Sequence, residues 1–257
     1  MSAVDEALEA VLQVLGERPS LLVTDVDGTL SRIVPRPEQA TVSEMARSAL
    51  RSLVGSLDHV AVITGREEPV ARRMVGVEGL TYIGSYALDA TEGLSFDAVR
   101  PALDMVTPSL VELPCVELER KQVSFALHYR NCLDSDHVGP QLLELLQPIA
   151  ERTRTRLLEG KQVVEVAPRA LPDKGTALLH VIAQREVKGV VFVGDDLADA
   201  AAFREIARRR ETTGLPGLSI AVVDDETPLL VSQSADLAIN GVDDVERLLD
   251  RLADRLA

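Results

Sequence analysis

The sequence has no tryptophan, only three tyrosines and four phenylalanines, and only two cysteines among its 257 residues. Basic residues are also scarce, because 27 lysines and arginines face 41 acidic residues and leave a net charge of -14. This balance argues against a nucleic-acid partner, since binding a phosphate backbone needs a basic surface. It also means that an anionic substrate needs a local cation, either a metal ion or a basic side chain.

Long apolar runs are missing as well. No run is long enough to span a bilayer, and residues 1–20 lack the basic start and apolar centre of a signal peptide. These residues are instead acidic and amphipathic, which indicates a helix. We therefore expect a cytoplasmic protein with no membrane partner. The two cysteines, Cys115 and Cys132, could form one disulfide, but we expect two free buried thiols.

Hydrophobic residues make up 46% of the chain and charged residues 26%, a balance typical of a globular protein. The length allows one large domain, or a core domain with a smaller insert. The expected strands are 21–24, 59–64, 80–84, 189–194, 218–223 and 235–240, and the expected helices are 43–57, 67–75, 174–186, 197–210 and 242–256. Apolar strands that alternate with helices predict an α/β fold with a doubly wound parallel sheet.

The middle of the chain follows a different pattern. Apolar and polar residues alternate over 115–130 and 154–168, and each stretch is typical of a β-hairpin. A helix over 140–153 separates the two hairpins. We therefore expect an α+β insert with an antiparallel sheet at 91–168, between two parts of the core at 1–90 and 169–257.

Polar residues gather where the core strands end or where the next helices begin. The clusters are residues 25–29 (Asp-Val-Asp-Gly-Thr), 64–66 (Thr-Gly-Arg), Lys174, and 194–199 with Asp195, Asp196 and Asp199. Because ligands of open parallel sheets bind beyond the carboxyl ends of the strands, we expect these clusters to share one crevice. Several carboxylates in one crevice need a cation, and oxygen ligands without histidine or cysteine favour Mg²⁺.

Each cluster has a simpler interpretation when it is taken alone. Asp-rich segments are common in turns, Thr64 suits a helix cap, and Lys174 suits a solvated surface. Residues 194–199 could be no more than an acidic helix start. An EF-hand is excluded, because Gly28 comes too early in the loop and a strand precedes it, and the sequence has no Walker A or Gly-x-Gly-x-x-Gly motif. What favours a catalytic site is the occurrence of all four clusters in order.

These clusters resemble the four motifs of the haloacid-dehalogenase (HAD) superfamily of phosphotransferases, and the insert resembles the cap domain of that superfamily. Within the HAD superfamily, the sequence resembles the trehalose-6-phosphate phosphatase family. The stretches that carry this resemblance are 25–40, 63–66, 82–89, 119–130, 158–175 and 192–203. The resemblance implies a HAD-like core with a cap, and a Mg²⁺-dependent phosphatase that converts trehalose 6-phosphate to trehalose and phosphate through an aspartyl-phosphate.

The resemblance also implies a role for individual residues. Asp25 is the implied nucleophile, and Asp27 is the implied acid and base. Thr64 and Lys174 are the groups implied to stabilise the phosphoryl group. The implied metal ligands are Asp25, Asp27 and Asp195, with Asp196 and Asp199 behind them. The implied substrate residues are Gly65 and Arg66 in the core and Glu119, Lys121, His128, Arg130, Lys161 and Glu165 in the cap.

The cap residues have a competing interpretation, because strand alternation also places charged residues on a solvated sheet face. His128 and Tyr129 point to opposite faces, so at most one of them faces a ligand. The expected partner is a small sugar phosphate. The sequence does not fix the oligomeric state, although a monomer is favoured.

The chain departs from the family pattern at a few positions. Residues 84–87 read Gly-Ser-Tyr-Ala where Gly-Asn/Ser-His-Gly is usual, and Arg120 replaces an acidic residue. Ala198 and Ala200 replace a threonine and an acidic residue in the fourth motif. These changes leave the phosphatase residues intact, but they leave the identity of the sugar undecided. The alternative substrates are sucrose phosphate, a glycosylglycerate phosphate and a hexose phosphate. A non-catalytic regulator that binds a sugar phosphate is a third hypothesis.

Overall fold

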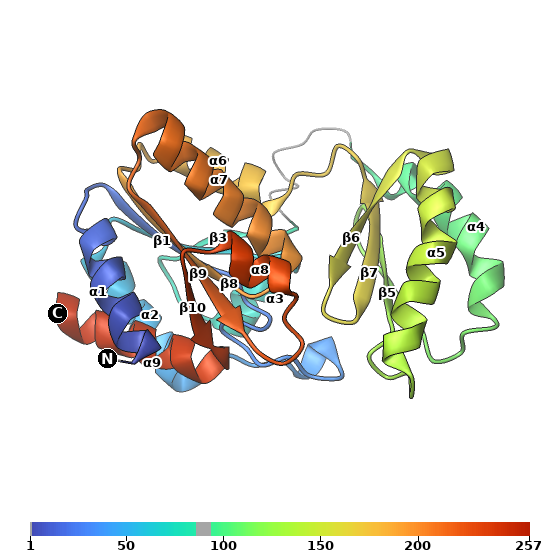
Figure 1. The fold of residues 1–257 in the computed structure, drawn as a ribbon, viewed down its shortest axis with the longest axis horizontal. Coiled ribbons are helices and arrows are strands. Elements are labelled where there is room, and N and C mark those ends of the chain that lie inside the picture. The colour runs from blue at the N-terminus through green and yellow to red at the C-terminus, as the bar shows by residue number, and fades with distance from the viewer. Residues whose placement is uncertain (1, 86–93) are drawn as a thin grey trace. The chain divides into compact units, whose positions relative to one another are not determined.

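The computed structural model of the chain describes residues 2–85 and 94–257 (Figure 1). Two compact units divide the chain, one comprising 1–87 and 172–257 and the other 88–171. The sequence pattern places the insert at 91–168. Within the described residues, every helix is too short or too polar to cross a membrane.

The first unit contains a six-stranded parallel sheet. Its strands are β1 (Ser20–Thr24), β2 (His59–Ile63), β3 (Thr81–Ile83), β8 (Gly189–Gly194), β9 (Gly217–Val223) and β10 (Leu237–Asn240). They lie in the order β10-β9-β8-β1-β2-β3, which confirms the expected doubly wound sheet. β1 therefore lies between β2 and β8, where the chain turns from one half of the sheet to the other. Ligands of open parallel sheets bind at this switch point.

Helices cover both faces of this sheet (Figure 1). The helices on one face are α1 (Ala3–Leu15), α2 (Glu44–Ser56), α3 (Glu68–Val75) and α9 (Gly241–Leu256). The helices on the other face are α6 (Lys174–Gln184), α7 (Leu197–Thr213) and α8 (Leu229–Ser234). In β1, Leu22 packs in the first core, whereas Leu21 and Val23 pack in the second. An unbroken apolar strand is therefore explained by burial on both faces.

The second unit has its own antiparallel sheet, with helices on one face (Figure 1). The elements are α4 (Arg100–Leu110), β4 (Glu117–Arg120), β5 (Phe125–His128), α5 (Ser135–Thr153), β6 (Thr155–Gly160) and β7 (Val163–Pro168). The strand order is β4-β5-β7-β6, which confirms the α+β insert. The sequence pattern does not predict α4, because Pro101 and Pro108 interrupt it. Pro101 lies in the first turn, where the missing N–H breaks no helical bond.

Cys115 and Cys132 form a disulfide in the second unit, so the expectation of two free thiols is wrong. Cys115 precedes β4 and Cys132 follows β5. The antiparallel register pairs Glu117 with His128, which brings the two flanking cysteines together at the open end of the hairpin. Spacing along the chain does not show this, because the distance depends on the register of the two strands.

Candidate active site

The first two aspartates of the site lie in a tight turn at the end of β1. The N–H of Asp25 donates to the carbonyl of Val193 (3.0 Å), which continues the pairing of β1 with β8. The carbonyl of Val26 accepts from the N–H groups of Leu30 (2.9 Å) and Ser31 (2.8 Å), so the chain turns back at once. As a result Asp25 is only 3% exposed, whereas Asp27 is half-buried. The two carboxylates also have different partners, because Asp25 contacts Lys174 and Asp27 contacts Arg66.

Gly28 allows this turn to approach β8 closely. Its φ is +84°, a conformation that side chains rarely adopt. A Cβ at this position would lie 2.0 Å from Oδ2 of Asp195. Next to it, the hydroxyl of the buried Thr29 donates to Oδ1 of Asp195 (3.1 Å). Thr29 is a site residue that the sequence reasoning missed, although it belongs to the Asp-Val-Asp-Gly-Thr motif.

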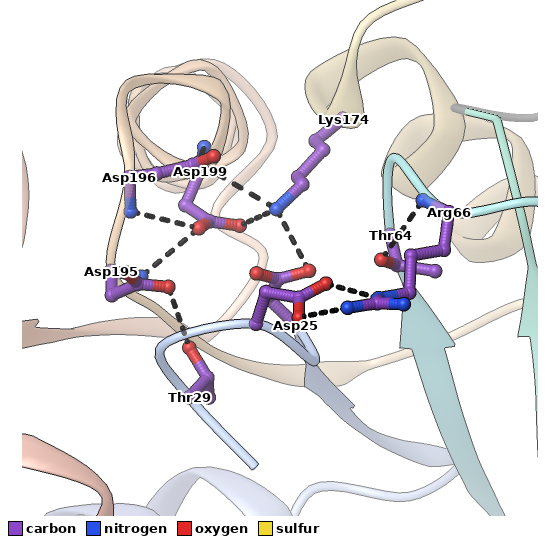
Figure 2. Close-up of polar contacts among 9 residues, drawn as sticks. Asp25, Thr29, Thr64, Arg66, Lys174, Asp195, Asp196 and Asp199 are labelled. Atoms are coloured by element: carbon purple, nitrogen blue, oxygen red, sulfur yellow. Dashed lines mark hydrogen bonds and ion pairs between the residues drawn. The ribbon is translucent and has the colours of Figure 1, made fainter. Parts of the chain in front are cut away.

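Lys174, the first residue of α6, supplies the buried positive charge of the site (Figure 2). Its side chain is 1% exposed. Its Nζ lies 2.7 Å from Oδ1 of Asp199, 3.0 Å from Oδ1 of Asp25 and 3.6 Å from Oδ1 of Asp196. A lysine without these carboxylates would be too costly to bury in its charged form. The interpretation of Lys174 as a surface charge therefore fails.

The start of α7 holds the acidic residues that face Lys174. Asp196 caps the helix, and its Oδ1 accepts from the N–H of Asp199 (2.9 Å). Oδ2 of Asp199 accepts from the N–H groups of Asp195 (3.0 Å) and Asp196 (3.1 Å), while its Oδ1 accepts from Lys174. Asp199 thus fixes the turn between β8 and α7 and orients Lys174 (Figure 2).

Burial governs the protonation of these carboxyl groups. It raises the pKa of Asp25 to about 6, with Asp196 and Asp27 acting in the same direction and Lys174 opposing them. Burial also acts upward on Asp196, but Lys174 and hydrogen bonds from Asp199 outweigh it and lower the pKa of Asp196. A further cation beside Asp25 would favour its ionised form.

Thr64, Gly65 and Arg66 follow β2, the neighbour of β1 on the other side. The N–H of Thr64 donates to the carbonyl of Ile83 (3.0 Å), and its buried hydroxyl accepts from the N–H of Arg66 (3.3 Å). The Arg66 side chain contacts Asp27, with Nε 2.5 Å from Oδ2 and Nη2 2.7 Å from Oδ1. Arg66, expected to contact the substrate, is thus paired with the expected acid and base.

Oxygen ligands suited to a metal ion come together at this strand end. Asp25, Asp195 and Asp199 each offer a carboxylate oxygen, and the three oxygens lie within 4.8 Å of one another. Oxygen donors alone are the chemistry that Mg²⁺ prefers. Because Lys174 and two backbone N–H groups already occupy Asp199, the side chains that best fit metal ligation are Asp25 and Asp195.

The second unit places several expected substrate residues on one face of its sheet. Glu119 pairs with Ala126, which pairs with Glu165 on the next strand, and His128 lies two residues from Ala126. The alternate residues of these strands pack against the core of α4 and α5. Glu119, His128 and Glu165 therefore share the face that the helices leave open, which we call the polar face.

Side chains on the polar face pair with one another. Glu165 is 7% exposed and accepts from Nζ of Lys121 (2.6 Å) and the hydroxyl of Ser124 (2.5 Å). Nε2 of His128 lies 2.8 Å from Oε2 of Glu119. At the next turn, Arg130 donates to the backbone carbonyl of Lys161 (3.1 Å). Such pairs present both charges to one surface, which suits the hydroxyl groups of a sugar.

Comparison with known protein families shows which family the chain belongs to. The trehalose-phosphatase family model matches residues 23–229, which is most of the chain. The chain belongs to the trehalose-phosphatase family. The expectation of that family, and of the HAD-like fold, is therefore confirmed.

Individual relatives resemble the chain over different lengths. A trehalose-phosphate phosphatase of Mycobacterium tuberculosis is 30% identical over 276 residues, covering 100% of this chain and 67% of that protein. An uncharacterized glycosyl hydrolase of the same organism is 33% identical over 226 residues, covering 79% of this chain but 17% of that protein. The C-terminal domain of Candida albicans trehalose-6-phosphate phosphatase has the same fold, with a TM-score of 0.81 and 20% identity. The match covers 98% of this chain and 96% of that domain.

The departures from the trehalose-phosphatase pattern fall in different places. Tyr86 and Ala87 lie outside the described residues. Arg120 pairs with Phe125, whose side chain is in the helix-covered core, and its guanidinium lies 3.9 Å from the ring centroid of Phe96. Arg120 therefore lies on the side opposite the polar face. Ala200 is fully buried, where an acidic side chain would need a partner.

Proposed function

We propose that the chain is a Mg²⁺-dependent phosphatase that converts trehalose 6-phosphate to trehalose and phosphate through an aspartyl-phosphate. The buried pair of Asp25 and Lys174, beside Asp195 at the end of the neighbouring strand, supports this proposal most directly. Asp25 is the nucleophile. Family membership supports the substrate, because a relative that matches the whole chain is named a trehalose-phosphate phosphatase.

The charge of the site favours a bound cation when a phosphate enters. Five carboxylates, Asp25, Asp27, Asp195, Asp196 and Asp199, face two basic side chains, Lys174 and Arg66. When all are ionised, the site carries a surplus of three negative charges, which repels a phosphate monoester. A divalent cation held by the Asp25 and Asp195 side chains and by the backbone carbonyl of Asp27 would screen the nucleophile from the phosphate.

Phosphoryl transfer then takes place in two steps on Asp25. In the first, a carboxylate oxygen of Asp25 bonds to phosphorus, and the bond between phosphorus and the sugar oxygen breaks. Lys174 neutralises the charge that develops between the nucleophile and the transferring group, and Thr64 donates a hydrogen bond to a phosphoryl oxygen. In the second step, water attacks phosphorus and releases inorganic phosphate and free Asp25.

Asp27 handles the protons of both steps. The leaving sugar oxygen takes a proton from Asp27 in the first step, and Asp27 takes a proton back from the attacking water in the second. This cycle leaves Asp27 unchanged overall. Asp27 and Asp25 have separate partners, Arg66 and Lys174, which suits two different roles at phosphorus.

We further propose that the insert recognises the sugar through the polar face. Glu119, Lys121, His128 and Glu165, with Arg130 and Lys161 at the adjoining turn, are the groups that would bind its hydroxyls. Charged and neutral hydrogen-bonding groups discriminate strongly between hydroxyl patterns, since a mismatched buried group loses its partner.

A panel of phosphate esters tests the substrate. Phosphate release should be compared by kcat/KM for trehalose 6-phosphate, sucrose phosphate, a glycosylglycerate phosphate and hexose phosphates. We expect trehalose 6-phosphate to rank first. A higher rank for another ester would replace the substrate and keep the chemistry, whereas no release from any ester with Mg²⁺ present would favour the non-catalytic regulator.

Chelation tests the metal. EDTA should abolish phosphate release, and added Mg²⁺ should restore it, because nothing else would offset the surplus negative charge. Activity that survives thorough chelation would remove the metal from the proposal. A cytoplasmic location and a monomeric state remain further proposals, to be checked by fractionation and by sedimentation.

A further inference from the structure

The contact between Arg66 and Asp27 joins two strand ends of the first unit. Arg66 follows β2, and Asp27 follows β1, which pairs with β2 in parallel. Their side chains form two hydrogen bonds, from Nε to Oδ2 (2.5 Å) and from Nη2 to Oδ1 (2.7 Å). Two parallel bonds from a planar guanidinium fix both the place and the plane of a carboxylate.

The backbone of Arg66 is also well anchored. Its N–H donates to the hydroxyl of Thr64 (3.3 Å), and its carbonyl accepts from the N–H of Ser85 (2.9 Å). The chain packs closely here, since a Cβ at Gly84 would lie 2.7 Å from the carbonyl oxygen of Arg66. Nη2 of Arg66 donates in addition to the carbonyl of Pro37 (3.0 Å). The guanidinium is therefore held from its backbone and from a third segment.

We propose that Arg66 is a positioning residue that holds the Asp27 carboxyl group, which gives its proton to the leaving oxygen, and that Arg66 does not bind the substrate. This inference rests on the proposed function, in which Asp27 is the acid and base. The side chain of Arg66 is 16% exposed and that of Asp27 32%, so the carboxylate remains more open to a ligand than the guanidinium that holds it. A misplaced proton donor costs rate even when the substrate binds normally.

Two leaving groups separate positioning from substrate binding. A sugar oxygen needs a proton in order to leave, whereas p-nitrophenolate leaves as a stable anion. Arg66→Ala should lower kcat/KM for the best sugar phosphate by about tenfold more than for p-nitrophenyl phosphate, as expected for impaired acid catalysis. Equal losses for both esters, or a rise in KM with unchanged kcat, would instead assign Arg66 to substrate binding and overturn the inference.

A double-mutant cycle tests whether Arg66 acts through Asp27. With the sugar phosphate, Arg66→Ala should change kcat/KM by less than about twofold in an Asp27→Asn background, because coupled residues are not additive. A full effect of Arg66→Ala in that background would overturn the inference.

Control variants exclude loss of charge or fold as the cause. Arg73→Ala removes an exposed arginine of α3 and should leave both rates unchanged. If Arg66→Ala does not fold, Arg66→Lys, which keeps the charge and loses the second hydrogen bond, must show the same selective loss. Failure of the proposed function and failure of the inference about Arg66 can be told apart. A wild-type protein that is inactive on every ester overturns the function. An active wild type whose Arg66→Ala variant loses activity equally on both esters overturns only the role of Arg66.

Discussion

The central charged group of the first unit, Asp25 with Lys174 and Asp195, is held differently from the Glu119–His128 pair of the second unit. In the first unit, Asp25, Lys174 and Asp195 are at most 3% exposed, and each lies at a strand end or a helix start. In the second unit, Glu119 and His128 lie along strands and pair with each other while partly exposed. A position at a strand end is set by topology, whereas a position along a strand face is set by side-chain pairing.

This difference has consequences for mutation. Buried charges that neutralise one another cannot be removed singly without a large effect, because the remaining charge loses its partner. Partly exposed pairs are screened by water and tolerate change better. We therefore expect single changes in the first unit to abolish chemistry, and single changes in the second to shift substrate preference.

The largest effect should come from Asp25→Asn, which should lower phosphate release by at least about 1,000-fold, because an amide cannot form the acyl phosphate. The fold should persist. Burial raises the pKa of Asp25 from 3.8 to about 6, so its ionisation lowers the stability of the fold as pH rises from about 4 to 6, and this loss persists at pH 7. Asparagine removes that loss, and Lys174 keeps Asp196 and Asp199 as partners, so the Tm at pH 7 should not fall.

Asp254→Asn, a change at an exposed position of α9, serves as the control for Asp25→Asn and should keep full activity. Turnover by Asp25→Asn at the wild-type rate would show that Asp25 is not the nucleophile. It would also contradict the expectation that single changes in the first unit abolish chemistry.

The next effect concerns the disulfide of the second unit. Cys115 and Cys132 are separated by 17 residues, and closing a loop of this length stabilises a fold by about 3 kcal/mol. Reduction should therefore lower the free energy of unfolding by that amount, measured by urea unfolding with and without a thiol reductant. The same reductant should not change the stability of a Cys115→Ser/Cys132→Ser variant. Equal stability of the oxidised and reduced wild type would show that the disulfide does not stabilise the fold.

A smaller effect should follow from Glu165→Gln on the polar face. Loss of the charged partner of Lys121 should lower kcat/KM for the sugar phosphate by about tenfold, as for one charge-assisted hydrogen bond. p-Nitrophenyl phosphate, which has no sugar, should be hydrolysed at the wild-type rate. Glu159→Gln, at an exposed position of the same hairpin, provides the control, and a parallel loss on both esters would place Glu165 outside sugar recognition.

The smallest effect should come from Arg120→Ala. Its guanidinium stacks on Phe96, a contact worth about 0.5–1 kcal/mol at an exposed site. The unfolding midpoint should fall slightly, and the order of substrates in the panel should stay the same. A reordered panel would show that this family departure sets the sugar after all.

The sequence predicts the first unit better than the second. Apolar strands followed by polar residues indicate both the sheet and its ligand edge, so the order of residues alone assigns Asp25, Thr64 and Lys174 to one edge of the sheet. The bonds from Arg66 to Asp27 and from Thr29 to Asp195 cannot be predicted in this way. They depend on side-chain conformations in the folded state.

In the second unit, alternation predicts which residues share a face but not which of them touch. The disulfide escapes prediction for a related reason, since it depends on the register of β4 and β5. The helix α4 is hidden by its two prolines.

The pairing of β1 with β8 also bears on how the chain is made. Ser20 pairs with Gly189, so the ribosome must synthesise the whole insert before the central strand acquires its second neighbour. Until then, one side of β1 is an unpaired strand edge, the kind of surface that promotes aggregation. The nascent core therefore depends on protection of that edge, while the insert, whose strands pair only with one another, can complete its sheet first.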